Sequence, residues 1–413
     1  MREFLALPCL LLSCALAACA GDEETLLAPL AEAAPLEPAP PAEPLYAVTG
    51  TSFGPEGNSS YVALVSSLAP DTRIDYRRVL ELPGGTSLFG SDRDGFFAVG
   101  AEEQPTITRF DVGDAGGFLQ RDTLSLAPYG LGYMWRDPGL VPFIAADKAY
   151  VIDAQTASVV IWNPAAMVLT GSFAIDGVLD PAFPDTAFEP DPTRRGDQLL
   201  IAATHSSETA SAPFSSLVVL DVQRDEVVSV AREERCGGLW NSVQAANGDI
   251  YYATGAWDAA QHRAYGEAVA AAPCVVRVKA GETTFDPDFL VRASELTLGS
   301  ATGALVAGPG DTAYVKALDE SLLPPAADFD ALWSAAAWRW WRLDLGTRAG
   351  AAPVDGIEPA SAGGGELSVE GKAYVLNVAQ DLAETTLFDL SAAGGPQRML
   401  TVRGWPYGIV RVR

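Results

Sequence analysis

Short apolar runs recur along most of the chain, and each begins just after a turn rich in glycine and aspartate. A loop and a second apolar run follow, and the second run often ends in Leu-Asp or Phe-Asp. Clear examples are the segments 94–100, 147–152 and 371–376. Runs of this length, rich in β-branched and aromatic residues, predict β-strands. Across residues 46–413 no long helical period is convincing, and only the start of 329–342 is compatible with a short helix.

The strand pairs repeat with a period of roughly 45–60 residues, and each unit holds about four short strands. A repeat of this kind is typical of a β-propeller, in which each unit forms one blade. The count predicts an all-β fold with seven blades, with six or eight as alternatives. Two stacked β-sandwiches are a further alternative, because alternation alone does not separate the two architectures.

The first and last strands predict how the ring closes. Residues 46–50 and 61–65 begin a unit that lacks its inner strand, and residues 407–412 form a strand without a blade of its own. Pairing of these N- and C-terminal strands would complete one blade and cover two exposed sheet edges.

The amino terminus resembles that of a bacterial lipoprotein. Residues 1–18 have the apolar run of a signal peptide, too short to cross a bilayer as a helix, and Leu16-Ala17-Ala18 precedes Cys19 as in a lipobox. We expect cleavage before Cys19 and lipidation of its thiol, with a plain secretory signal as the alternative. Residues 19–45 are rich in Ala, Pro and Glu and are expected to be a disordered tether. The folded domain is then 46–413.

The charge of the chain limits its partners. Lys plus Arg number 27 against 53 Asp plus Glu, which gives a formal net charge of −26. Nucleic acids and anionic lipids both need a basic surface, so we expect neither as a partner, and the membrane would be reached through the lipid anchor. No segment resembles an assembly helix, so we expect a monomer. We expect the lipid anchor to lie in the outer membrane, with the domain facing the periplasm or the cell surface.

Two cysteines remain in the mature chain besides Cys19. In an oxidising compartment Cys236 and Cys274 are expected to form a disulfide, with two buried free thiols as the alternative. The chain has two histidines, His205 and His262, both in stretches rich in Ser, Ala and Gly that we interpret as polar loops. We therefore predict no metal site and no cofactor.

Motifs for catalysis are scarce. The sequence has neither a Gly-x-Ser-x-Gly nucleophile elbow nor a phosphate-binding Gly-Lys-Ser/Thr loop. Residues 286–288 and 92–95 offer carboxylates to Ca²⁺, but we interpret both as ordinary turns because neither has the spacing of an EF-hand loop. A pair of carboxylates acting as acid and base stays open, because such a pair is defined only in three dimensions.

Aromatic residues give the candidate ligand site. The segment 329–342 carries four tryptophans and two arginines, and alternation sends Trp338 and Trp340 to one face of its strand. Trp and Arg together suit an aromatic or anionic ligand. Core packing between blades is the alternative for these side chains. The candidate residues are Trp338, Arg339, Trp340, Trp257, Tyr265 and Arg263.

Residues 274–291, CVVRVKAGETTFDPDFLV, resemble a segment of the MxcI-like lipoprotein propellers, and Trp341-Arg342-Leu343-Asp344 with Gly363-Gly364-Gly365 is similar to another part of that family. The resemblance implies an envelope lipoprotein with an accessory role beside an outer-membrane siderophore receptor. It implies no catalytic residue.

Three functions follow as hypotheses. The favoured one is a non-catalytic binding propeller whose partner is a siderophore, another small aromatic or anionic ligand, or an outer-membrane receptor. The second is a propeller enzyme of the lactonase, lyase or dehydrogenase type, since fold alone does not settle function. The third is a purely structural envelope component.

Overall fold

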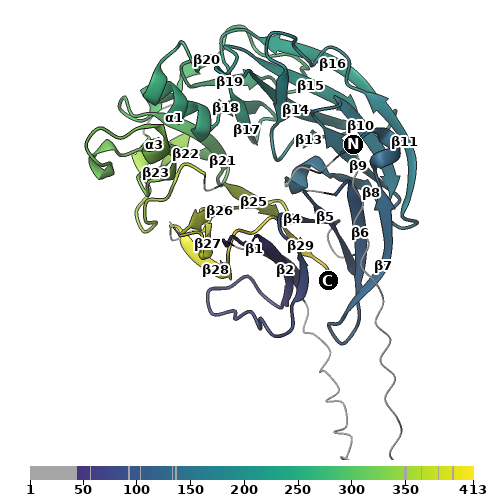
Figure 1. The fold of residues 1–413 in the computed structure, drawn as a ribbon. Helices are drawn as coiled ribbons and strands as arrows, with labels where there is room; N and C mark the ends of the chain where they lie inside the picture. The colour runs from purple at the N-terminus through teal and green to yellow at the C-terminus, as the bar shows by residue number, and fades with distance from the viewer. Residues whose placement is uncertain are drawn as a thin grey trace, which may run out of the picture. The chain divides into compact units, whose positions relative to one another are not determined.

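The computed structural model describes residues 44–413 except 56, 92–93, 103, 133, 135–136, 348–350, 364, 380 and 393–394. These residues form seven antiparallel sheets arranged in a ring, a seven-bladed β-propeller (Figure 1). The predicted fold class and blade number are confirmed. The proposed signal peptide, Cys19 and the tether up to residue 43 lie outside the described residues, and these remain predictions.

Each of the first four blades is one antiparallel sheet. Blade 1 consists of β29 (Ile409–Arg411), β1 (Tyr46–Ser52), β2 (Ser59–Val65) and β3 (Leu80–Pro83). Blade 2 consists of β4 (Thr86–Phe89), β5 (Phe96–Ala101), β6 (Thr106–Val112) and β7 (Phe118–Ser125). Blade 3 consists of β8 (Phe143–Ala145), β9 (Lys148–Asp153), β10 (Ser158–Asn163) and β11 (Val168–Ala174). Blade 4 consists of β12 (Asp185–Phe188), β14 (Gln198–Ser206), β15 (Ser215–Asp221) and β16 (Glu226–Glu233), and β13 (Thr193–Arg195) also pairs with β14.

The remaining three blades follow the same plan. Blade 5 consists of β17 (Leu239–Gln244), β18 (Ile250–Thr254), β19 (Cys274–Val278) and β20 (Leu290–Arg292). Blade 6 consists of β21 (Thr302–Ala307), β22 (Thr312–Leu318), β23 (Trp338–Asp344) and β24 (Ala352–Pro353). Blade 7 consists of β25 (Glu366–Val369), β26 (Lys372–Val378), β27 (Glu384–Asp389) and β28 (Gln397–Arg403).

The ring closes through the C-terminal strand. β29 lies antiparallel to β1, with Val48 opposite Ile409 and Tyr46 opposite Arg411. Beyond this ladder, the Leu45 amide donates to the Arg413 carbonyl at 3.1 Å. The predicted pairing of the two terminal strands is therefore confirmed, and it leaves β1 with a partner on both sides.

The cores lie between neighbouring blades. Successive side chains of a strand point to opposite faces, so β14 contributes Leu199 and Ile201 to the core shared with blade 3. Its alternate residues Leu200 and Ala202 belong to the core shared with blade 5. A strand buried on both faces is largely apolar, which explains the continuous apolar runs of the sequence.

Short helices occupy the connections between strands. They are α1 (Ala256–Tyr265), α2 (Ala293–Leu296), α3 (Phe329–Ser334) and the 3₁₀ turns η1 (Ala127–Tyr129), η2 (Pro138–Leu140) and η3 (Glu320–Leu322). The short helix expected at the start of 329–342 is present as α3, where the Asp328 side chain caps the Ala331 amide at 2.9 Å. The helix α1, of 10 residues, was not predicted from the sequence. In the part of the chain that the structure describes, no helix has the length and apolar character needed to cross a membrane.

Cys236 and Cys274 form the expected disulfide, with their Cα atoms 5.8 Å apart. Cys274 begins β19 and Cys236 precedes β17, so the bridge encloses β17, β18 and α1. Both side chains are fully buried. The bridge therefore fixes the base of the insertion that carries α1.

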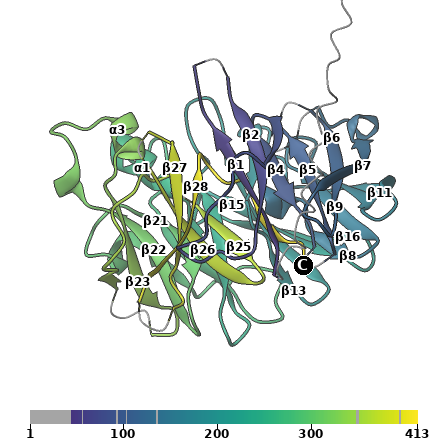
Figure 2. The ribbon, with the colours of Figure 1, turned by 90° about the horizontal axis from the view of Figure 1, so that it is seen from below.

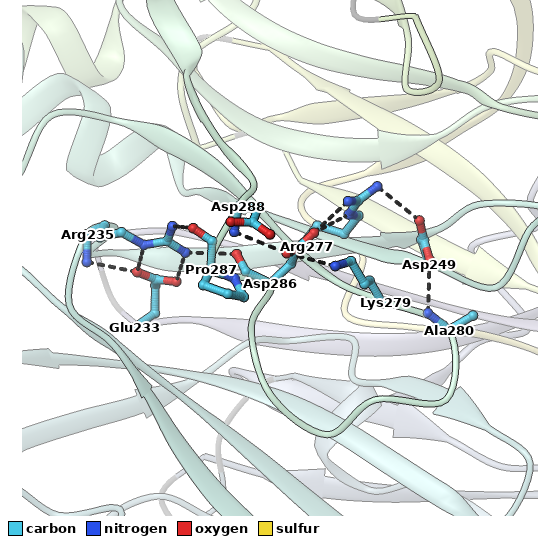
Figure 3. Close-up of polar contacts among 9 residues, drawn as sticks. All are labelled: Glu233, Arg235, Asp249, Arg277, Lys279, Ala280, Asp286, Pro287 and Asp288. Atoms are coloured by element: carbon cyan, nitrogen blue, oxygen red, sulfur yellow. Dashed lines mark hydrogen bonds and ion pairs between the residues drawn. The ribbon is translucent and has the colours of Figure 1, made fainter.

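A second clasp holds the segment after β19, which carries the family resemblance (Figure 3). The Arg277 guanidinium donates to Asp286 at 2.5 Å and reaches Asp249 at 3.3 Å. The Arg235 guanidinium binds Glu233 and also donates to the Pro287 carbonyl at 2.5 Å. In the described residues no group of three or more His, Cys, Asp or Glu side chains is placed to hold a metal ion.

The ion pairs of Asp286 should make the stability of the fold fall at acid pH. The hydrogen bond from Arg277 lowers the pKa of this carboxyl to about 2. A carboxyl group whose pKa is lower in the folded state stabilises the fold at any pH above its unfolded-state pKa. That contribution is lost as the pH falls toward the folded-state pKa. We expect Asp286→Asn to flatten the fall of melting temperature between about pH 4 and pH 2. Asp71→Asn, at an exposed aspartate, is the control, and equal slopes for all three proteins would contradict the assignment.

Candidate ligand site in the central channel

A cavity of about 960 Å³ lies at the centre of the ring. Every blade contributes to its wall through the strand next to the channel. The wall residues from these strands include Leu88 (β4), Ile144 (β8), Ala187 (β12), Asn241 (β17), Ala304 (β21), Glu366 (β25) and Val410 (β29). A ring of blades places these residues together although they are far apart in sequence.

Insertions between strands build one wall of the cavity mouth. α1 follows β18 and α3 precedes β23, and both views show these helices next to each other (Figures 1 and 2). The Trp257 ring packs edge-to-face on Phe329 and Trp333, with centroids 4.8 and 4.6 Å apart. Trp257 remains 43% exposed and Tyr265 54% exposed. We call Trp257, Tyr265, Phe329 and Trp333 the aromatic wall; all but Phe329 line the cavity.

Two polar residues of α1, Asp258 and Gln261, form a hydrogen-bonding group with Ser211 beside the aromatic wall. The Ser211 hydroxyl lies 2.8 Å from Asp258 Oδ1 and 3.0 Å from Gln261 Oε1, and all three residues line the cavity. Burial raises the pKa of Asp258 to about 6. Near neutral pH this carboxyl can therefore exchange a proton, and it can accept or donate hydrogen bonds to a ligand.

A second polar cluster lies in the channel wall and combines residues of blades 4, 5 and 7. The Asn241 amide approaches Glu366 Oε1 at 3.5 Å, and Glu366 Oε2 is buried without a hydrogen-bond partner. Burial, and then repulsion by Asp191, raise the pKa of Glu366 to about 8. Asp191 reaches the channel, where the surrounding wall removes solvation and raises its pKa. The channel therefore holds carboxyl groups that are protonated more than is usual.

Two buried groups stand behind that cluster. Lys316 is fully buried on β22 and donates to the carbonyls of Ser361 and Ala362, at 3.1 and 3.2 Å. Burial lowers the pKa of Lys316 to about 7. Glu189 is also fully buried, accepts the Ala202 amide through Oε1 at 2.8 Å and leaves Oε2 without a partner. Burial raises its pKa well above the usual range.

The three candidate ligand residues on β23 have different surroundings in the structure. Trp338 and Trp340 share a face, as the alternation predicted, and both are buried, at 1% and 4% exposed. Trp338 donates through Nε1 to the Leu332 carbonyl at 2.8 Å and packs under α3, so the expectation that it contacts a ligand is corrected to a core role. Trp340 lines the cavity, and Arg339 forms an ion pair with Asp319 at 2.9 Å.

The residues predicted on the other insertion lie on α1. Trp257 and Tyr265 line the cavity, which keeps them as ligand candidates. Arg263 points its guanidinium at Glu320, with an ion pair of 2.6 Å. This pair links α1 to the segment just before α3, so its simplest role is to hold the two insertions together.

The histidines have structural partners. His205 lies in β14 and is buried, not in a polar loop as expected, because the strand runs on to Ser206. Its ring nitrogens lie 3.1 Å from Thr186 Oγ1 and 3.0 Å from Ser216 Oγ. Burial lowers its pKa to about 4, so the imidazole is neutral. His262, on α1, contacts the Ala270 carbonyl at 2.9 Å.

Sequence reasoning missed Asp258, Asp191, Asn241, Lys316 and Glu366. One available signal is a polar residue at the start of an inner strand, as at Glu366 in β25, and exposed strand ends carry the same signal.

The fold and site define the protein as a seven-bladed propeller with an acidic, aromatic-lined channel. The structure is similar to a proposed 6-phosphogluconolactonase of Bacteroides uniformis (TM-score 0.55, 12% identity, 89% of this chain and 99% of that chain covered). It is similar to the periplasmic gluconolactonase of Pseudomonas aeruginosa (TM-score 0.55, 12% identity, 89% and 100% covered). A protein from Lactobacillus plantarum also matches (TM-score 0.50, 12% identity, 89% and 97% covered). At this identity the similarity establishes the fold alone.

No protein family model matches the sequence, and no curated protein is similar to it in sequence.

Proposed function

We propose that the protein binds a small organic ligand in the mouth of its central channel. The observation that carries the proposal is the cavity of about 960 Å³, which is lined by all seven blades and by exposed aromatic rings beside hydrogen-bonding groups. Ligand sites are typically concave and largely apolar, with a few placed polar groups. Trp257 and Tyr265 supply the apolar surface here, and Asp258, Gln261 and Ser211 supply the polar groups.

Lactone hydrolysis is a second candidate function. Two of the similar structures bear gluconolactonase names, and Asp258 has a pKa near neutrality within the cavity. A carboxylate in that range can take a proton from an attacking water. The shared fold alone does not carry this reading, because propellers support many activities.

The envelope setting and the siderophore role stay proposals that rest on the sequence. The described ionisable residues of the cavity wall argue against an anionic siderophore at this site. Five of them are acidic, Asp137, Asp191, Glu208, Asp258 and Glu366, against Arg194 and the neutral His205. A siderophore partner would then have to use another face.

Trp257→Ala is expected to weaken ligand binding at least about tenfold while the fold is retained, because a half-exposed ring contributes stacking area rather than core. The measurement is a thermal-shift and calorimetric titration with sugars, amino sugars, polyamines, a catecholate siderophore and gluconolactone. Hydrolysis of the lactone is followed in the same samples by acid release.

Leu179→Ala is the control, because Leu179 is 52% exposed and lies outside the cavity wall. Equal affinities for the wild type, Trp257→Ala and Leu179→Ala would contradict a site at the aromatic wall. A panel in which nothing binds would count against the proposed function as a whole.

A further inference from the structure

We propose that the ligand carries a positively charged amino group, which the channel holds between its carboxyl groups and the aromatic wall. This inference rests on the proposed function and names the class of ligand. Its support comes from three features of the described residues, namely the charge of the cavity wall, the buried carboxyl groups behind it and the exposed aromatic faces.

The charge of the wall selects for cations. Its acidic residues come from the connections and strands of several blades: Asp137, Asp191, Glu208, Asp258 and Glu366. Arg194 is the one basic residue that lines the cavity among those described. A concave site lined by one sign of charge focuses its field and concentrates ions of the opposite sign. The net charge of the chain, −26, acts in the same direction.

Two carboxyl groups, Glu366 in the wall and Glu189 behind it, each have one oxygen without a hydrogen-bond donor. Glu366 Oε2 and Glu189 Oε2 are buried without a partner, although buried polar atoms are normally paired. Glu189, Asp191 and Glu366 also repel one another, which is one cause of the raised pKa of Glu189. A cation in the adjacent channel would relieve this repulsion, and an ammonium group would bring three donors.

Lys316 only partly compensates the negative charge of the channel. Its Nζ lies 5.1 Å from the centroid of Trp340 and donates to two backbone carbonyls, which fixes it within the wall. Because burial lowers its pKa to about 7, it is only partly protonated at neutral pH. Its charge therefore offsets only part of that of Glu366, the carboxyl group with which it interacts.

The aromatic wall offers the complementary surface. An ammonium over the face of Trp or Tyr is attracted by the ring quadrupole, and the attraction grows when the site is shielded from water. Trp257 and Tyr265 are the exposed rings, and Phe329 and Trp333 pack behind them. Trp257 and Asp258 of α1 both line the cavity, so an aromatic ring and a carboxyl group are available to the same ligand.

The test uses glucosamine and glucose, which differ by an amino group in place of one hydroxyl, with gluconate, choline and spermidine as further probes. Isothermal titration of the full chain should show glucosamine binding at least about tenfold more tightly than glucose. An ammonium group gains both a cation–π contact with an aromatic ring and a charge-assisted hydrogen bond to a carboxylate, whereas a hydroxyl gains only a neutral hydrogen bond. Affinity for each amine should fall as salt is raised, because salt screens charge.

Proton release gives a readout that stacking alone would not change. Glu366, Asp191, Glu189 and Asp258 have raised pKa values, so a bound cation should lower them and release protons at pH 7. Titrations in two buffers with different ionisation enthalpies measure that release. Asp258→Asn should reduce both the amine affinity and the protons released, whereas Asp71→Asn should change neither.

The outcomes separate this inference from the proposed function. Equal affinity for glucose and glucosamine, or tighter binding of gluconate, would overturn the cationic ligand and leave a ligand-binding channel standing. Amine binding without salt dependence or proton release would likewise overturn it. If no probe binds, both the inference and the proposed function fail.

Discussion

A chain that ends at Tyr407 is expected to lose its cooperative fold. The deletion removes β29, whose Ile409 and Val410 are 6% and 5% exposed, and also the fully buried Val412. Burial of each such side chain contributes about 1.5–3 kcal/mol, so the loss is about 5–9 kcal/mol before any hydrogen bond is considered. That is comparable with the whole stability of a typical domain, about 5–15 kcal/mol.

The same deletion exposes an edge of β1. Each backbone group that paired with β29 becomes open to another strand, and such edges promote aggregation. Differential scanning calorimetry and near-ultraviolet circular dichroism of the truncated chain measure the effect. The chain of residues 1–413, in which β29 is intact, is the control. A cooperative transition of the truncated chain close to that of the control would contradict closure by β29.

Replacement of both bridged cysteines, Cys236→Ala with Cys274→Ala, is expected to lower the free energy of unfolding by about 4 kcal/mol on the chain-entropy model for a loop of this length. The two positions are 38 residues apart, and the loop between them contains α1. Guanidinium unfolding under oxidising conditions measures the difference.

The wild type under reducing conditions is the matched control, because reduction removes the bridge without changing the sequence. Its unfolding midpoint should fall toward that of the double variant. Equal midpoints for the oxidised wild type and the variant would contradict a stabilising bridge. Since α1 carries Trp257 and Asp258, the double variant should also bind ligand more weakly.

Turn-delimited apolar runs were enough to predict the propeller. Because central strands such as β14 are buried on both faces, their sequences are largely apolar, and the Gly/Asp turns mark where each strand begins. Closure was predictable for a similar reason, since residues 407–412 form an apolar strand with no blade of their own. Edges left unpaired are unfavourable, and the first blade lacked one strand.

Local sequence gave less information on the insertions. Alternation predicted that Trp338 and Trp340 share a face, but it did not say that this face points into the protein. α1 is short and Ala-rich, and its ends are marked only by Gly255 and Gly266. Such a segment has too few apolar positions to show a helical period.

The channel cluster was beyond the reach of sequence. Asp191, Asn241, Lys316 and Glu366 belong to four different blades, and only the closed ring brings them together. Their raised or lowered pKa values follow from burial and from one another, so no single segment carries the signal. Sequence did place Trp257 and Tyr265 among the candidates, because large aromatic residues in an insertion are conspicuous.

The central claim is that a small ligand binds in the mouth of the channel. Hydrogen–deuterium exchange of the full chain, with and without a saturating amine such as glucosamine or spermidine, tests it most directly. The account predicts slower exchange in residues 205–211 and 255–266, which line the mouth, and no change in the outer strands β11 and β16. Protection confined to the outer strands, with the mouth unchanged at saturation, would contradict the account.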